Sequence, residues 1–187
     1  IGESYPYKTL FDFCHRQHAN YYENVGMAVF QRLKIAPTGL RILELGAAND
    51  ALVSHLESLG NRVTAYVVSE YECKQIICSR KVNDLSLGLV LENESQDLFV
   101  SIDFLEHLTE SDIRLTIREA ARLCDRIFVT ISTRPSGRLG PHGENLHLTV
   151  QPIQWWAKIF RRYWDVMVQE GLDPEQFIFK GRSWRTA

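Results

Sequence analysis

The sequence predicts an α/β fold, a doubly wound and mostly parallel sheet of seven strands with an N-terminal helical extension and a terminal antiparallel hairpin. Short apolar segments rich in β-branched residues alternate with segments whose apolar residues recur at three- and four-residue spacing. This alternation is typical of a parallel sheet covered by helices. Near the end of the chain, two apolar segments are separated only by the Gly171–Pro174 turn, and strands joined by so short a turn pair antiparallel.

The expected elements follow in chain order. Residues 8–34 have helical spacing, and Gly26 is expected to divide them into two helices. Thr109 with Asp112 forms an acidic variant of the capping box, which marks a helix start, and Gly60 marks a helix end. The expected strands are residues 41–46, 62–68, 85–91, 97–102, 126–132, 164–169 and 175–180. The other expected helices run over residues 52–59, 70–82, 109–124 and 152–163.

The composition is that of a globular protein. The 187 residues are 45% hydrophobic and 24% charged, which excludes disorder as the dominant state. The net charge of −2 disfavours nucleic acid as a partner. No apolar run is long enough to span a bilayer and no signal-peptide pattern opens the chain, so we expect no membrane contact and a cytoplasmic location.

The chain is expected to have two parts, a helical lid or cap over residues 1–38 and an α/β domain over residues 39–187. It begins at Ile1, which suggests a domain cut from a longer polypeptide whose other domains are possible partners. The cysteines are interpreted as free thiols of a reducing compartment. They are Cys14, Cys73, Cys78 and Cys124.

Three segments lie where strand ends meet at one edge of such a sheet. Residues 44–48 (ELGAA) follow the first strand, residues 101–108 (SIDFLEHL) follow the fourth, and residues 145–148 (NLHL) precede the last helix. A glycine directly after a strand lets the backbone approach a ligand closely. Together, over about residues 40–180, these segments resemble the class I S-adenosylmethionine (SAM)-dependent methyltransferases, a resemblance that implies a Rossmann-like fold and SAM as cofactor.

The resemblance also implies where the cofactor binds. The glycine turn would hold its methionine end, the loop after the third strand its adenine, and the segment after the fourth strand would border the transferred methyl group. The residues so implied are Glu44, Gly46, Ala47, Ala48, Val67, Val68, Glu92, Asn93 and Asp103.

Two positions depart from the family pattern. Val67 stands where the family has an acid that binds both ribose hydroxyls, and valine accepts no hydrogen bond. Glu70 could replace that acid, or it could simply begin the next helix. Asp50 adds a negative charge to the glycine turn.

His147 is the first candidate for a catalytic base, followed by His107 and Glu106, because a base that works near neutral pH suits histidine. The alternative is that these side chains only bond the backbone and fix their loops. Arg134 and Arg138 could clamp an anionic group of the substrate or belong to a solvated loop. No metal site is expected, since no metal-ligand spacing occurs.

The expected function is methyl transfer from SAM to a small-molecule or sugar-like acceptor. The alternative is a methyltransferase-fold domain that has lost catalysis and serves as a scaffold or binding module in a larger protein. Val67 and Asp50 favour the alternative, whereas the intact segment from Phe104 to Leu108 favours the enzyme.

Overall fold

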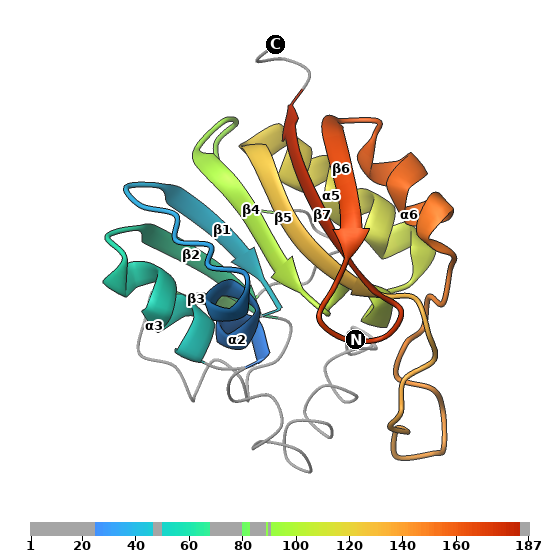
Figure 1. The fold of residues 1–187 in the computed structure, drawn as a ribbon. Coiled ribbons are helices and arrows are strands. Elements are labelled where there is room, and N and C mark those ends of the chain that lie inside the picture. Colours follow the sequence, from blue (N-terminus) through green and yellow to red (C-terminus); the bar gives the residue numbers. More distant parts are fainter. Residues whose placement is uncertain (1–24, 47–49, 68–79, 83–88, 90, 184–187) are drawn as a thin grey trace, which may run out of the picture.

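A seven-stranded sheet forms the centre of the molecule, in the order β3-β2-β1-β4-β5-β7-β6 (Figure 1). The computed structural model describes residues 25–46, 50–67, 80–82, 89 and 91–183. The strands are β1 (Arg41–Leu45), β2 (Arg62–Val67), β3 (Arg80–Val82), β4 (Gln96–Ile102), β5 (Cys124–Ser132), β6 (Trp164–Glu170) and β7 (Gln176–Ser183). Pairing is parallel from β3 to β5, whereas β7 pairs antiparallel with β5 and β6. The predicted fold class is confirmed.

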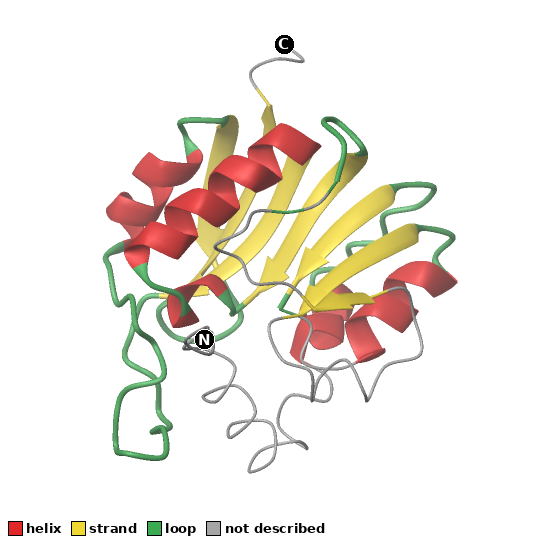
Figure 2. Ribbon diagram, turned by 180° about the vertical axis from the view of Figure 1, so that it is seen from behind, coloured by secondary structure: helices red, strands yellow, loops and turns green. Residues whose placement is uncertain are grey.

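Helices cover both faces of the sheet (Figures 1 and 2). On one side lie α2 (Val25–Arg32) and α3 (Asp50–Ser58), and on the other lie α5 (Glu110–Leu123) and α6 (Ile153–Phe160). A short 3-10 helix, η2 (Leu105–His107), follows β4. Each face has its own apolar cluster, because alternate residues of each strand point to opposite faces.

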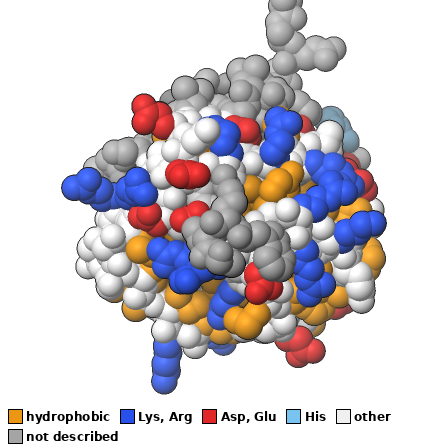
Figure 3. All heavy atoms as spheres, turned by 90° about the horizontal axis from the view of Figure 1, so that it is seen from above, with side chains coloured by type: hydrophobic (Ala, Val, Ile, Leu, Met, Phe, Trp, Pro, Cys, Tyr) orange, Lys and Arg blue, Asp and Glu red, His pale blue; other side chains and the backbone are white. Residues whose placement is uncertain are grey.

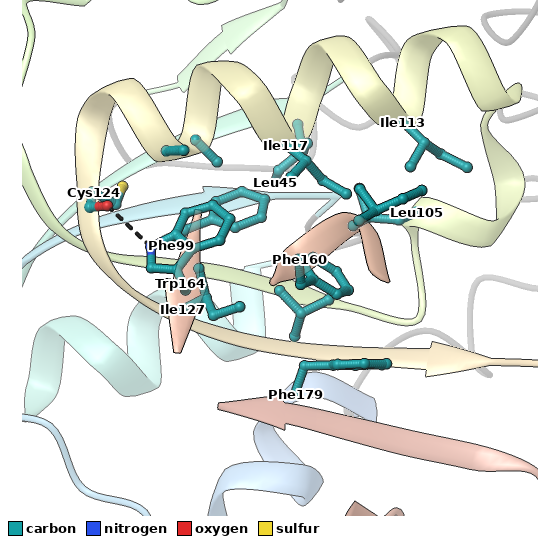
Figure 4. Packing of buried hydrophobic residues seen from close by; sticks show 14 of the residues in the cluster. Leu45, Phe99, Leu105, Ile113, Ile117, Cys124, Ile127, Phe160, Trp164 and Phe179 are labelled. Atoms are coloured by element: carbon teal, nitrogen blue, oxygen red, sulfur yellow. Dashed lines mark hydrogen bonds between the residues drawn. The ribbon is translucent and has the colours of Figure 1, made fainter. Parts of the chain in front are cut away.

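The larger apolar cluster lies between the sheet and α5 and α6. Figure 4 shows Ile113 and Ile117 directed from α5 toward the sheet. The indole N–H of Trp164 donates to the carbonyl of Cys124 at 3.4 Å, which joins the starts of β6 and β5. Cys124 is a buried free thiol, as predicted, and burial raises its pKa. The other three cysteines lie outside the described residues.

The predicted caps are confirmed. Thr109 caps α5, since its hydroxyl accepts from the Asp112 N–H at 3.4 Å. Gly60 has a φ of +83° and its N–H donates to the Glu57 carbonyl at 2.9 Å, while Asn61 N–H donates to Leu56 at 3.4 Å. This pair of bonds is a Schellman motif, which needs a left-handed residue at the Gly60 position.

The third strand was predicted in the wrong place. β3 is Arg80–Val82, so the last three residues of the helix expected over 70–82 form a strand instead, and residues 70–79 lie outside the described residues. Neither Leu89 nor Leu91 lies in a strand. Their carbonyls accept instead from the guanidinium of Arg122, at 2.9 and 2.8 Å.

The start of the chain is described only from Val25. Gly26, the predicted break, lies inside α2 rather than between helices, and the earlier helix falls outside the described residues. Phe30 of α2 is fully buried and meets Phe128 of β5 edge to face, with ring centroids 4.8 Å apart. α2 therefore belongs to the core of the sheet, and a lid formed by the N-terminal segment would have to come from residues 1–24.

Candidate functional site

The turn after β1 requires glycine for two independent reasons. Gly46 has a φ of +92°, which side-chain-bearing residues rarely adopt, and an added Cβ would overlap the ring of Phe104. The turn is also fixed by hydrogen bonds. Gly46 N–H donates to the Tyr66 carbonyl at 3.2 Å, and the Ser101 hydroxyl donates to the Leu45 carbonyl at 3.0 Å. The turn is thus held against β2 and β4.

The other residues expected at the glycine turn are described only in part. Glu44 is buried in β1, with 1% of its surface exposed. Ala47 and Ala48 lie outside the described residues, so their predicted role stays a prediction.

Val67 ends β2 at the same edge of the sheet and is fully buried, in register with Val82 of β3. It offers no acceptor for a hydroxyl group at the position where an acid was expected. Val68 and Glu70, which follow it, lie outside the described residues.

Glu92 and Asn93 lie at the opposite edge of the sheet. They were expected to follow the third strand directly. β3 ends ten residues earlier, at Val82, and Glu92 and Asn93 stand just before the start of β4. Asn93 accepts a hydrogen bond at 2.8 Å from Arg122, which stands at the end of α5, where the chain enters β5. The starts of parallel strands and their ends form opposite edges, so these residues lie away from the glycine turn, and their predicted contact with the adenine stays a prediction.

Asp103 directly follows β4 and points toward β5 and β7. Its carboxylate accepts from the Thr130 hydroxyl at 2.7 Å and from the Gln176 side-chain amide at 2.6 Å. Burial raises the pKa of Asp103, which these two hydrogen bonds oppose. Its φ of +47° is a left-handed conformation that aspartate tolerates better than most residues. Neither hydrogen-bond partner of Asp103 could be predicted from the local sequence.

Glu106 is a fully buried carboxyl in η2. Its Oε1 accepts from the Ser132 N–H at 2.9 Å, while Oε2 has no hydrogen-bond partner among the described residues. Burial, followed by the nearby charge of Asp103, raises the pKa of Glu106 well above its ordinary value. Its backbone carbonyl accepts from Thr149 N–H at 3.0 Å, so Glu106 ties the loop after β5 to the end of β4.

Glu106→Gln is expected to change how stability depends on pH. Because the pKa of Glu106 is raised, the folded state holds its proton at pH values where the unfolded state has lost it, so wild-type stability falls as pH rises. The variant should therefore gain unfolding free energy relative to wild type as pH rises from about 5 to neutral pH, by an amount on the order of 1–3 kcal/mol. Urea unfolding across that range measures the gain.

Glu119→Gln provides the matched control with the opposite sign. The ion pair of Glu119 with Arg122 at 2.8 Å lowers the pKa of Glu119, so its contribution is present at neutral pH and is lost in acid. This variant should lose stability at neutral pH. If Glu106→Gln behaved in the same way, Glu106 would be an ionised and well-solvated carboxylate in the folded protein.

His107 and His147 meet at the same edge of the sheet, with ring centroids 4.9 Å apart and ring planes at 87°. His107 Nδ1 lies 2.8 Å from the Leu146 carbonyl, and His147 Nδ1 lies 2.6 Å from the Arg134 carbonyl. A carbonyl only accepts, so Nδ1 carries the proton on each ring and the lone pair of a neutral ring is at Nε2. Burial lowers the pKa of His147, which keeps this ring neutral near pH 7.

The loop that carries His147 is organised by Asn145. The Asn145 side-chain oxygen accepts from the backbone N–H of His147 at 2.8 Å and of Ser136 at 3.1 Å. Asn145 also forms an isolated bridge with Leu139. The Arg134 carbonyl thereby comes within reach of His147, whereas an anion clamp by Arg134 and Arg138 stays a prediction.

The described part of the chain contains no group of three or more His, Cys, Asp or Glu side chains placed to hold a metal ion. It also contains no helix long and apolar enough to cross a membrane. The edge of the sheet opposite the site carries basic and acidic side chains intermixed (Figure 3).

Comparison with known proteins identifies the fold. No protein-family model matches the chain, and no curated protein matches it. Solved structures do. A Haloferax volcanii methyltransferase in complex with a methyltransferase activator has a TM-score of 0.70 at 12% identity, over 93% of this chain and 97% of that one. The magnesium protoporphyrin IX methyltransferase of Synechocystis, with S-adenosylhomocysteine (SAH) bound, has a TM-score of 0.68 at 16% identity, over 96% and 97%.

A third structure is the 1,6-didemethyltoxoflavin N1-methyltransferase of Burkholderia thailandensis with its substrate and SAH. It has a TM-score of 0.65 at 11% identity and covers 98% of this chain and 91% of its own. The chain therefore has the fold of the class I SAM-dependent methyltransferases, as its sequence motifs predicted.

Proposed function

We propose that this chain, with its methyltransferase fold, binds SAM and transfers the methyl group to a small-molecule acceptor. The glycine turn after β1 carries the proposal. Open α/β sheets bind ligands beyond the carboxyl ends of their strands, and the Gly46 turn lies there, in a left-handed conformation with the Phe104 ring packed against the glycine. The similar proteins from Synechocystis and Burkholderia thailandensis contain SAH and act on small molecules.

On this proposal, three described residues would border the cofactor at its methionine end. The Gly46 turn, fixed by Ser101 and bordered by Phe104, would lie against that end, and Asp103 would stand near the transferred methyl group. The cofactor would supply a methyl group on a positively charged sulfur, which makes it open to attack by a nucleophile. The protein then has to align the acceptor and, for an oxygen or nitrogen acceptor, remove its proton.

His147 is the side chain that, on this proposal, accepts the proton of the acceptor. Its Nδ1–H donates to the Arg134 carbonyl, which fixes both the tautomer and the ring, and the lone pair at Nε2 can accept. Because its pKa is lowered, His147 is neutral and ready to act near pH 7. His107 lies against it, whereas Glu106 is fully buried and acts, on this proposal, by positioning the loop that holds His147.

One observation favours the second candidate, a binding or scaffold module without catalysis. Val67 is apolar and fully buried at the position from which an acid would hold the ribose. Missing hydrogen bonds to a charged group reduce affinity by about 1.5–3 kcal/mol each. The two candidates predict different results when an acid is placed at position 67. The enzyme candidate predicts that the cofactor then binds more tightly, whereas the scaffold candidate predicts that it still does not bind.

Val67→Asp is therefore expected to tighten SAH binding by about tenfold or more, because it restores a carboxylate at the end of β2. Calorimetric titration of SAH measures the change, and Val67→Leu, which adds no acceptor, should bind like wild type. The aspartate would also lower stability, since it replaces a fully buried valine. Absence of SAH binding in all three folded proteins would favour the scaffold candidate.

A further inference from the structure

A groove of about 750 Å³ lies between α6 and the hairpin of β6 and β7, apart from the glycine turn and the histidines. Its apolar lining comes from both sides, with Ile153 and Ala157 on the helix and Val168 and Phe177 on the strands. This volume lies within the roughly 300–1,000 Å³ that is typical of small-molecule sites.

The charges along the groove are separated. Lys158, Arg161 and Arg162 line it near the end of α6, where the chain turns back into β6. Glu170 lines it where β6 ends, on the far side of the apolar section. Neither Lys158 nor Arg162 makes an ion pair in the described part of the chain.

The length of the groove follows from the helix. Ile153 and Arg161 are separated by about 12 Å along the axis of α6, since an α-helix rises 1.5 Å per residue. A ligand that extends from Ile153 to the cations would cover the apolar section and place one end beside Arg162. Its opposite end would have to be uncharged or basic, because Glu170 is there.

We propose that this groove binds an amphipathic anion, a molecule with an apolar body and one carboxylate or phosphate head group. The apolar body lies over Ala157 and Val168, and the head group pairs with Lys158 and Arg162. Guanidinium groups bind both kinds of head group through paired hydrogen bonds. The site is separate from the proposed cofactor pocket and does not depend on methyl transfer.

Titration with octanoate and with octyl phosphate tests the site, with 1-octanol as the uncharged counterpart. Saturable binding of either anion, weaker binding of 1-octanol and a loss of affinity with added salt are expected. The head group that binds more tightly identifies the ligand class. No saturation by either anion in the millimolar range, or equal binding of 1-octanol, would overturn the proposal.

Arg162→Gln should weaken binding of the anion about tenfold, the usual effect of removing one charge-assisted contact. Arg118→Gln, which removes the same charge from the exposed side of α5, is the matched control and should have no effect. Equal weakening by both variants would show unspecific attraction and overturn the site. SAH titrated into Arg162→Gln should bind as in wild type, so the cofactor proposal is judged separately.

Val168→Trp gives a second, independent test, because it fills the groove from the half-buried face of an edge strand. It should abolish anion binding while circular dichroism stays unchanged. If sedimentation instead showed a wild-type dimer that Val168→Trp dissociates, a second copy of the chain would occupy the groove, and the anion site would be refuted.

Discussion

Gly46→Ala is expected to abolish SAH binding and to lower the free energy of unfolding by about 2–6 kcal/mol. A side chain at a φ of +92° costs about 1–3 kcal/mol in backbone strain. Overlap of the new Cβ with Phe104, which is 2% exposed, costs about 1–3 kcal/mol more, as overpacking does in other cores. Since the turn must move to relieve the overlap, the proposed cofactor site moves with it. Urea unfolding and SAH calorimetry measure the two effects.

Gly60→Ala separates strain from overlap. Gly60 also has a positive φ, +83°, but nothing lies within 4 Å of an added Cβ. The Gly60→Ala control should lose only the part of the unfolding free energy that backbone strain costs, and it should keep SAH binding. Combining Gly46→Ala with Phe104→Leu should recover part of the stability, which a double-mutant cycle detects as coupling. Equal stability of Gly46→Ala and Gly60→Ala would show that Phe104 does not fill the space beside the turn.

His147→Ala is expected to lower turnover by about 10²–10⁴-fold, the usual contribution of a general base, with SAH affinity unchanged. The rate of the wild type should fall in acid as His147 is protonated. Because the pKa of His147 is lowered, that fall should begin below the ordinary histidine range, and the rate should be flat near neutral pH. Initial rates across pH, on an oxygen or nitrogen acceptor, give both results.

His142→Ala is the control from the same loop, since His142 is exposed and stands five residues earlier. It should keep both turnover and pH profile. If His147→Ala lost less than tenfold, or kept the acid fall of the wild type, alignment alone would carry the reaction and His147 would serve only to fix its loop.

The sequence was informative where local patterns decide the structure. β4 and β5 were predicted to within two residues, because their apolar β-branched runs form strands that are buried on both faces. β3 was missed, since Arg80, Lys81 and Val82 have no such pattern and form a strand only against β2. Residues 85–91 have the pattern, but of these only Leu89 and Leu91 are described, and Arg122, more than 30 positions away, binds their backbone carbonyls.

In the candidate site, too, some residues could be predicted from local sequence patterns and others could not. Glu106, His107 and His147 come together as expected, because they follow strands whose ends share one edge. The partners that fix the site are distant in sequence. Gln176 binds Asp103 from 73 positions away, and Phe104 fills the space that makes Gly46 obligatory. Such contacts depend on the packed fold, and nothing in the local sequence indicates them.

The most direct test of the cofactor assignment is calorimetric titration of SAM and SAH into the wild-type chain. The proposal predicts saturable binding at one site, weakened by the valine at position 67 but lost on Gly46→Ala while Gly60→Ala retains it. No heat of binding from either compound in the millimolar range, with a folded wild-type protein, would contradict it.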